Sequence, residues 1–492
     1  MMKLAPDWSQ PGTPFRHTWE GLVNIDQFRW LVRRDTQEHL KLAHDELGAR
    51  HVRAVGMFDD EMRVLGLSPS SFLDKARRPR LNWQVVDYVI DSLLDMGINP
   101  MFTTSFTPGS IASGNKTCFS TQSRVSPPRN WPEWADLVRQ GVSHALDRYG
   151  EAVIRQWYFE VWNEPNLSGF WDGSQADFHQ LWATTYRAIK DVNPDLRVGG
   201  PSAARAEWIA DLIEFGQKND CVPDYIVAHI YNNDSESKPL SPFDGPQADL
   251  ENKSPHFASG VIRGVRNLLD QMGYSGEVHW NEWGRSWWPC YAERETAGEA
   301  AWIAKTMAEV SQSGDYFAYW CLSDIYDQVG YGAETFHGNY GMLNLQGLRK
   351  PAYHAFQLLS MLGTERLTLH AEGTTALCNA IATRSDRGQQ VMVYADQAVD
   401  IQVCLPPNTQ SPALRLYQIT PEQNNIVRLW EQMGSPAYLH RDQLRDLQSR
   451  NILCPTANPL RIEPCPDGNG VRFSLSGAGM ALLDISNLRP TS

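Results

Sequence analysis

Between about residues 35 and 355, short β-branched or aromatic runs alternate with amphipathic helical segments, and this order constrains the fold more than any other feature. A repeated strand, turn and helix predicts parallel strands joined by helical crossovers. Helices are expected at 37–49, 83–96, 131–149 and 178–192. Strands are expected at 22–25, 51–55, 99–104, 158–162, 197–200, 225–231, 277–280 and 317–322. Eight such strands predict an α/β fold of the (β/α)8 TIM-barrel type.

After about residue 365 the pattern changes to short alternating segments without long helices between them, at 376–383, 390–395, 414–419 and 471–475. This pattern is typical of antiparallel strands. The sequence therefore predicts a catalytic barrel over 15–360 and a C-terminal antiparallel β-sandwich over 361–492. The N-terminal segment 1–14 is a candidate addition to that second domain.

The charge of the chain limits its partners. With 44 Lys and Arg against 57 Asp and Glu, its net charge is −13, which repels nucleic acid and anionic membranes. No segment reaches the roughly 18 apolar residues of a membrane-spanning helix. The first 15 residues lack the apolar run of a secretory signal. We therefore expect a cytoplasmic protein with no nucleic-acid or membrane partner.

The cysteines and aromatic residues add two expectations. Eight cysteines are scattered over positions 118, 221, 290, 321, 378, 404, 454 and 465 without a close pair, so reduced and mostly buried thiols are expected. No metal-ligand spacing appears. The chain is rich in Trp (18) and Tyr (17), and aromatic faces are the usual platform for sugar rings.

Two glutamates at the carboxyl ends of predicted strands carry the chemistry. Glu164 follows the strand of segment 157–166 (Trp-Tyr-Phe-Glu-Val-Trp-Asn-Glu-Pro-Asn), and Glu282 ends the apolar stretch of segment 278–284. Barrel active sites lie at the carboxyl ends of the strands, so a closed barrel brings these distant residues together. Two carboxylates that flank a bond are what glycoside hydrolysis requires.

The sequence resembles glycoside hydrolase family 39 from about residue 15 to 355, and more weakly beyond. The resemblance rests on segment 157–167, Arg53 to Gly56 with Phe58 and Asp59-Asp60, 198–201 (Val-Gly-Gly-Pro), and 336–342 onward to 350–353. It implies a retaining glycosidase, with β-xylosidase and α-L-iduronidase as the best-known activities of the family. It also implies a barrel with the acid/base on strand four and the nucleophile on strand seven.

Carried over by position, the resemblance implies that Glu164 is the general acid/base and Glu282 the nucleophile. Asn163 is then expected to bond the sugar 2-hydroxyl. His229 and Tyr231 alternate on the sixth strand and so share one face, where the resemblance implies a sugar contact and a phenol that orients the nucleophile.

The remaining expected sugar contacts are Trp320, as an aromatic floor, Phe106, as a wall, and Asp327. Some positions depart from the family pattern. Val55 replaces a usual His and Thr103 a carboxylate, while Asp327 and Gln328 stand where Glu-Glu is frequent. These departures affect sugar hydroxyl contacts and leave the catalytic pair intact.

The function predicted first is an exo-acting β-xylosidase-like hydrolase of oligosaccharides or glycosides, without cofactor or metal. Alternatives are a β-galactosidase, an α-L-arabinosidase-type enzyme, an α-L-iduronidase-like enzyme or an endo-acting polysaccharide hydrolase. A uronidase needs a cation for the sugar carboxylate, for which Arg285, Arg349 and Lys350 are the candidates. A non-catalytic carbohydrate-binding protein is a remote alternative, because both glutamates are present. The sequence leaves open whether the chain forms a homo-oligomer.

Overall fold

The computed structural model describes residues 1–67, 79–234, 254–326, 328, 330, 332–407, 413–457, 460–465 and 468–486. The chain divides into two compact units. The barrel unit comprises Glu20–Trp287 and Ser313–Tyr331. The sandwich unit comprises Met1–Trp19, Trp288–Gln312 and Gly332–Ser492.

Eight parallel strands form the sheet of the barrel unit, in an order that follows the sequence. They are β3 (Leu22–Gln27), β4 (His51–Val55), β7 (Asn99–Thr103), β8 (Tyr158–Glu160), β9 (Arg197–Ala203), β10 (Tyr225–Tyr231), β11 (Glu277–Gly284) and β12 (Tyr316–Tyr319). Just beyond β12, the Leu322 N–H donates to the Asn24 carbonyl of β3 over 2.9 Å, so the sheet nearly closes. The predicted barrel is confirmed.

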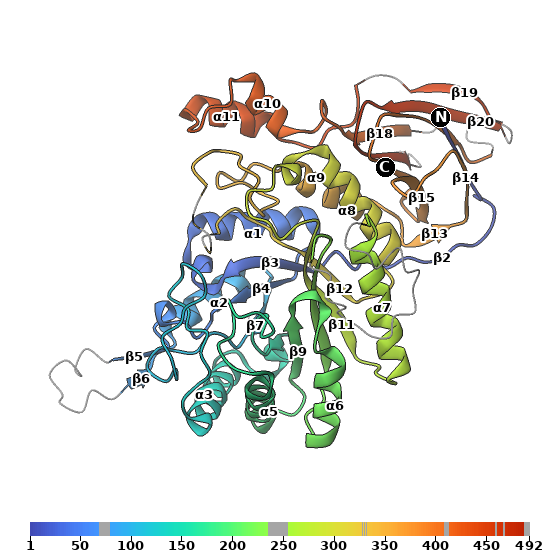
Figure 1. Ribbon diagram of the computed structural model, residues 1–492. Helices are drawn as coiled ribbons and strands as arrows, with labels where there is room; N and C mark the ends of the chain where they lie inside the picture. The colour runs from blue at the N-terminus through green and yellow to red at the C-terminus, as the bar shows by residue number, and fades with distance from the viewer. Residues whose placement is uncertain are drawn as a thin grey trace. The chain divides into compact units, whose positions relative to one another are not determined.

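Helices of the barrel unit lie outside the strands, as Figure 1 shows for α3, α5 and α6. They are α1 (Arg34–Leu47), α2 (Gln84–Asp95), α3 (Trp131–Tyr149), α4 (Glu151–Ile154), α5 (Gln175–Val192), α6 (Ile209–Asn219) and α7 (Phe257–Gln271). The side chain of Asn130 caps α3, and Ser174 and Asp177 form a capping box at α5. These caps fix where α3 and α5 begin. The loop after β4 also holds a two-stranded ribbon of β5 (Leu65–Leu67) and β6 (Pro79–Leu81).

The side chains inside the barrel change character along the strands. An apolar cluster that includes Met101, Tyr158 and Tyr225 fills one layer. Because strand side chains alternate, the residues two positions further along point to the same interior. At those positions β7 carries Thr103 and β8 carries Glu160, which are paired in the parallel ladder. A polar layer therefore begins toward the carboxyl ends of the strands.

The sandwich unit contains two sheets around one apolar core. The order of the first is β14 (Leu369–Glu372), β1 (Met2–Pro6), β17 (Val399–Cys404), β20 (Gly468–Leu475), β19 (Arg461–Cys465). The order of the second is β18 (Ala413–Ile419), β21 (Gly479–Ser486), β16 (Gly388–Ala395), β15 (Cys378–Ser385), β13 (Glu365–Leu367), β2 (Thr13–Pro14). The N-terminal strand β1 thus lies between β14 and β17, with Met2 and Leu4 in the core.

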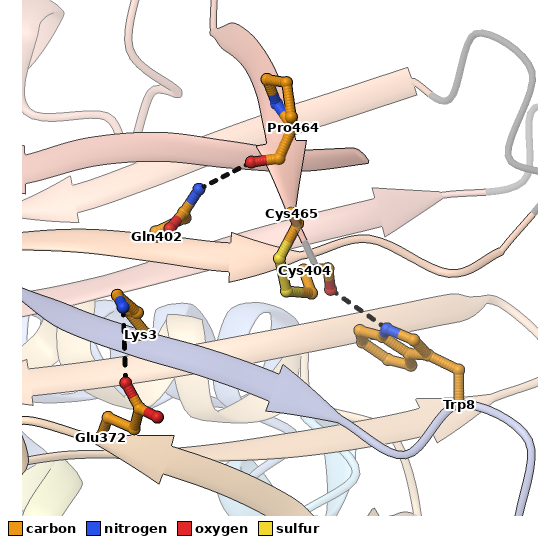
Figure 2. Close-up of a disulfide and its surroundings, with 7 residues drawn as sticks. All are labelled: Lys3, Trp8, Glu372, Gln402, Cys404, Pro464 and Cys465. Carbon is orange, nitrogen blue, oxygen red and sulfur yellow. Dashed lines mark hydrogen bonds and ion pairs between the residues drawn. A yellow bond between two sulfur atoms is a disulfide. The ribbon is translucent and has the colours of Figure 1, made fainter. Parts of the chain in front are cut away.

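Cys404 and Cys465 form a disulfide, so the expectation of reduced thiols is wrong for this pair. Figure 2 shows the bond joining the ends of β17 and β19, both of which pair with β20. At Gly470 of β20, a Cβ atom would lie 3.2 Å from the Cβ of Cys465, so the absent side chain leaves room for the bridge. The two cysteines are 61 positions apart, so the sequence alone did not show that they lie close together.

The described part of the sandwich unit also contains the α-helices α8 (Ala297–Val310), α9 (Pro351–Ser360), α10 (Ile426–Gln432) and α11 (Arg441–Arg450). The last two interrupt the expected run of strands. Leu447 is the one buried residue of α11, so this helix has almost no apolar period from which to predict it. Among all helices of the described residues, none is long and apolar enough to cross a membrane.

Candidate active site

Glu164 is held in the loop after β8 by an uncommon backbone conformation. Trp162 and Glu164 have positive φ angles of 70° and 45°, a region that non-glycine residues seldom adopt. The Glu164 N–H donates to the carbonyl of Ser202 over 2.9 Å, which ties this loop to β9. Strain of this kind persists where the surrounding structure enforces it, and it is frequent at functional sites.

Glu282 lies on β11 after a β-bulge. In the ladder with β10, Val227 pairs with His279 and His229 pairs with Glu282, so three steps of β11 oppose two steps of β10. The extra residue changes the phase of the alternation. As a result, both Asn281 and Glu282 contact residues of the barrel interior.

The two glutamates share one imidazole. The Nδ1 atom of His229 lies 3.0 Å from Oε1 of Glu164 and 3.3 Å from Oε2 of Glu282. The other oxygen of Glu282 accepts a 2.7 Å hydrogen bond from the Tyr231 hydroxyl. One oxygen of each glutamate and one His229 nitrogen lie within 4.8 Å of one another. The predicted acid/base, nucleophile and strand-six pair therefore meet at one point.

Burial governs the protonation of these groups. It raises the pKa of Glu164 to about 7, against the attraction of Arg53 and Arg205. It also raises the pKa of Glu282, which His229, Arg53 and the Tyr231 hydrogen bond oppose. Burial lowers the pKa of His229 to about 4, so the imidazole is neutral near pH 7. These environments favour a protonated Glu164 beside an ionised Glu282.

A fully buried ion pair lies beside the glutamates. Arg53 of β4 and Glu160 of β8 are both inaccessible to solvent and make bonds of 2.7 and 2.9 Å. The guanidinium also donates to the side-chain oxygen of Asn163 over 2.5 Å, and its Nη1 lies 3.4 Å from Oε2 of Glu282. Asn163 is thus fixed next to the two catalytic candidates.

The other predicted sugar contacts have varied surroundings. Trp320 follows β12, and its backbone N–H donates to the backbone carbonyl of Trp283 over 2.9 Å. Phe106 is completely buried, and its ring centroid lies 5.3 Å from that of Trp162. Asp327 lies outside the described residues. The neighbouring Gln328 bonds Asp26 over 2.8 Å and Tyr326 over 3.1 Å.

A family model described as Glycosyl hydrolases family 39 matches residues 2–461, which is most of the chain. The chain belongs to glycoside hydrolase family 39. This confirms the family resemblance and makes the protein a glycoside hydrolase of a retaining family.

Known proteins and a solved structure resemble the chain over most of its length. A protein named Beta-xylosidase from Caldicellulosiruptor saccharolyticus is 31% identical over 462 residues, which cover 91% of each chain. An Alpha-L-iduronidase from Homo sapiens is 31% identical over 446 residues, covering 79% of this chain and 64% of the relative. The crystal structure of a monomeric beta-xylosidase from Caulobacter crescentus CB15 superposes with a TM-score of 0.85 at 26% identity, covering 99% and 100%.

The carboxyl separation suits the retaining chemistry of family 39. Retaining enzymes place the two carboxyl groups about 5 to 5.5 Å apart, whereas inverting enzymes leave about 6.5 to 9.5 Å for a water molecule. Here one oxygen of Glu164 and one of Glu282 lie within 4.8 Å. This distance is shorter than the separation that accommodates an attacking water molecule, and it suits direct attack by one carboxylate on a sugar carbon.

Several polar residues of the site received no role in the sequence analysis. These are Arg53, Glu160, Asn281 and Asp234. A charged residue inside an otherwise apolar strand was the available signal for Arg53 and Glu160. Asp234, just after β10, accepts the Tyr231 N–H over 2.8 Å, and burial raises its pKa to about 7.

The cluster of Glu164, His229 and Glu282 also has a geometry that could accept a metal ion. Within the described part of the chain, no other three His, Cys, Asp or Glu residues bring ligand atoms so close together. The same atoms already contact one another through hydrogen-bond distances. Proton sharing therefore accounts for this arrangement.

Proposed function

We propose that this family 39 enzyme is an exo-acting β-xylosidase that removes xylose units from oligosaccharides or glycosides. The single observation that carries its chemistry is the meeting of Glu164 and Glu282 within 4.8 Å, with different environments for the two carboxyl groups. The substrate is supported by the names of the similar proteins from Caldicellulosiruptor saccharolyticus and Geobacillus stearothermophilus, both called Beta-xylosidase.

In the first step, the ionised Glu282 attacks the anomeric carbon while the glycosidic C–O bond breaks. The proton of Glu164 moves to the departing oxygen, so the leaving group departs as a neutral alcohol. The product is a glycosyl ester of Glu282. Tyr231, by donating to the other oxygen of the carboxylate, holds it for the attack.

In the second step, water attacks the anomeric carbon and the ester bond to Glu282 breaks. Glu164 is now ionised and takes the proton from this water, because the negative charge on Glu282 is absent from the ester and no longer favours the protonated acid. The released sugar keeps its anomeric configuration. Asn163, held by Arg53, is placed to bond the 2-hydroxyl in both steps.

The uronidase alternative loses support from two of its three candidate cations. Lys350 is fully buried and pairs with Glu295 at 3.0 Å. Arg349 donates from its guanidinium to the carbonyl of Asn451 over 3.3 Å. Pairing with a sugar carboxylate would require these residues to give up contacts that they make within the sandwich unit.

A panel of nitrophenyl glycosides tests the proposal. Nitrophenyl β-xyloside is expected to be cleaved fastest, ahead of the galactoside, glucoside, arabinosides and iduronide. With xylobiose, NMR is expected to show xylose formed first in its β configuration. Glu282→Ala is expected to be folded and inactive. Preference for another glycoside overturns the substrate, whereas normal turnover by Glu282→Ala overturns the catalytic assignment.

A further inference from the structure

Glu160 is a third buried carboxylate near the two catalytic candidates. It lies on β8, four residues before Glu164, and its side chain is inaccessible to solvent. An isolated charge in this position would be very costly, so a buried carboxylate requires partners. Its partners are Arg53 of β4 and Asn281 of β11, two strands that lie on opposite sides of β8 in the order of the sheet.

Glu160 accepts two hydrogen bonds from one edge of the Arg53 guanidinium. Its oxygens lie 2.9 Å from Nε and 2.7 Å from Nη2. This two-point contact fixes the plane of the guanidinium, because its N–H groups have fixed directions. The remaining nitrogen, Nη1, consequently points at Oε2 of Glu282, 3.4 Å away.

The same carboxylate reaches the residue that precedes each catalytic candidate. The side-chain amide of Asn281 donates to Oε2 of Glu160 over 2.6 Å. On the other side, the Nη2 atom that bonds Glu160 also donates to Asn163. Since the amide oxygen of Asn163 accepts from Arg53, its NH2 group is left to face a different partner.

We propose that Glu160 is a positioning residue that orients Asn163 and Glu282 through Arg53, and β11 through Asn281. This inference rests on the proposed function, in which Asn163 bonds the 2-hydroxyl and Glu282 is the nucleophile. In this arrangement Glu160 aligns Asn163 and Glu282, and its negative charge offsets the positive charge of Arg53.

The charge of Glu160 has a separate consequence for pH dependence. Arg53 faces Glu160, Glu164 and Glu282, and their attraction keeps its pKa above the usual value despite burial. The other titratable groups of the described residues that face these carboxylates are His229, Tyr225, Tyr231, Asp234, Arg205 and Cys118. A neutral residue in place of Glu160 leaves Arg53 with one anionic partner fewer. Arg53 then stabilises the charged forms of Glu164 and Glu282 more strongly, which lowers the pKa of both carboxyl groups.

Glu160→Gln is the direct test, because it removes the charge and keeps the shape. We expect both limbs of the pH profile of kcat/KM to move to lower pH, by about one unit. We also expect kcat to fall about a hundredfold with little change in KM, because alignment is lost. Limbs at the wild-type pH, or an unchanged kcat, would overturn the proposal.

Glu277→Gln is the matched control. Glu277 begins β11 at the other end of the strand from Glu282, and it accepts from Tyr158 and His279 over 3.0 and 2.8 Å. This variant also removes one hydrogen-bonded carboxylate from the barrel. The limbs of its pH profile are expected to match those of the wild type. If they moved as far as in Glu160→Gln, the movement in Glu160→Gln would be a general response to the loss of a charge, and the proposal would be overturned.

Glu160→Asp keeps the charge on a shorter side chain and decides the case if Glu160→Gln does not fold. We expect its pH limbs to return to the wild-type values while kcat stays low, and wild-type kcat would contradict the positioning role. Carboxyl 13C NMR titration of Glu164 and Glu282 measures the same displacement without turnover. A displacement in NMR from an enzyme that cleaves no glycoside would therefore refute the proposed function, while it would still show that the charge of Glu160 acts on Glu164 and Glu282.

Discussion

The hydroxyl of Tyr231 donates a 2.7 Å hydrogen bond to Oε1 of Glu282, and both residues are buried. A hydrogen bond to a carboxylate favours its ionised form. The pKa of Glu282 is raised by burial, and this bond is among the contacts that oppose the rise. Tyr231 therefore has an electrostatic effect as well as an orienting one.

Tyr231→Phe removes this bond and leaves the ring. The pKa of Glu282 is expected to rise further, so the acidic limb of kcat/KM moves to higher pH while the basic limb stays in place. A charge-assisted bond contributes about 1.5 to 3 kcal/mol, which predicts a loss of about tenfold or more in kcat/KM. Initial rates across pH measure both effects, and an acidic limb that does not move would argue against this contact.

The wild-type enzyme is expected to have a bell-shaped pH profile. Activity requires a protonated Glu164 and an ionised Glu282, so it falls at high pH as Glu164 loses its proton, near its pKa of about 7. It falls at low pH as Glu282 gains one. The two apparent values belong to the coupled pair. In Glu164→Gln the basic limb is expected to disappear on a substrate with a good leaving group; its persistence would assign the acid to another residue.

The order of the barrel strands could be predicted from the sequence because their pattern is local. Alternating strand and amphipathic helix signals gave all eight strands of the sheet within a few residues, and the bounds of α3 agree at both ends. Helix α11 could not be found in this way, since its residues are almost all polar. The disulfide between Cys404 and Cys465 depends on sheet pairing across 61 residues, which no local pattern records.

In the active site, too, local sequence patterns predicted some features, whereas others depend on contacts between distant residues. Glu164 and Glu282 could be singled out because each stands at the carboxyl end of an apolar segment, and the barrel then brings them together. The positive φ of Glu164 and the bulge that turns both Asn281 and Glu282 inward depend on tertiary contacts. The role of Glu160 depends on pairing with Arg53, 107 residues away, so it became visible only in three dimensions.

Glu164→Ala separates acid catalysis from nucleophilic attack. An activated aryl glycoside has a leaving group that needs little protonation, so the first step is expected to survive while the second slows and the glycosyl ester accumulates. Azide, which needs no general base, is expected to restore turnover and give a glycosyl azide of retained configuration. NMR of the product measures the configuration of the glycosyl azide. An inverted configuration would mean that azide takes the place of Glu282 as the nucleophile of the first step, and not the place of water in the second.

The disulfide between Cys404 and Cys465 is expected to stabilise the sandwich unit. Closing a loop of 61 residues restricts the unfolded chain, which in the entropic model corresponds to about 4 kcal/mol. Cys465→Ser is therefore expected to lower the Tm measured by calorimetry without reductant, and dithiothreitol is expected to lower the wild-type Tm in the same way. The variant itself is expected to be insensitive to dithiothreitol.

Cys454→Ser is the matched control for this last prediction. Cys454 belongs to the same unit, is exposed and forms no disulfide. Its removal changes one thiol to a hydroxyl without opening a loop, so its Tm is expected to equal that of the wild type and to fall equally with dithiothreitol. If Cys465→Ser and Cys454→Ser had the same Tm, the bridge would contribute nothing to stability, and the core of the two sheets alone would hold the sandwich unit together.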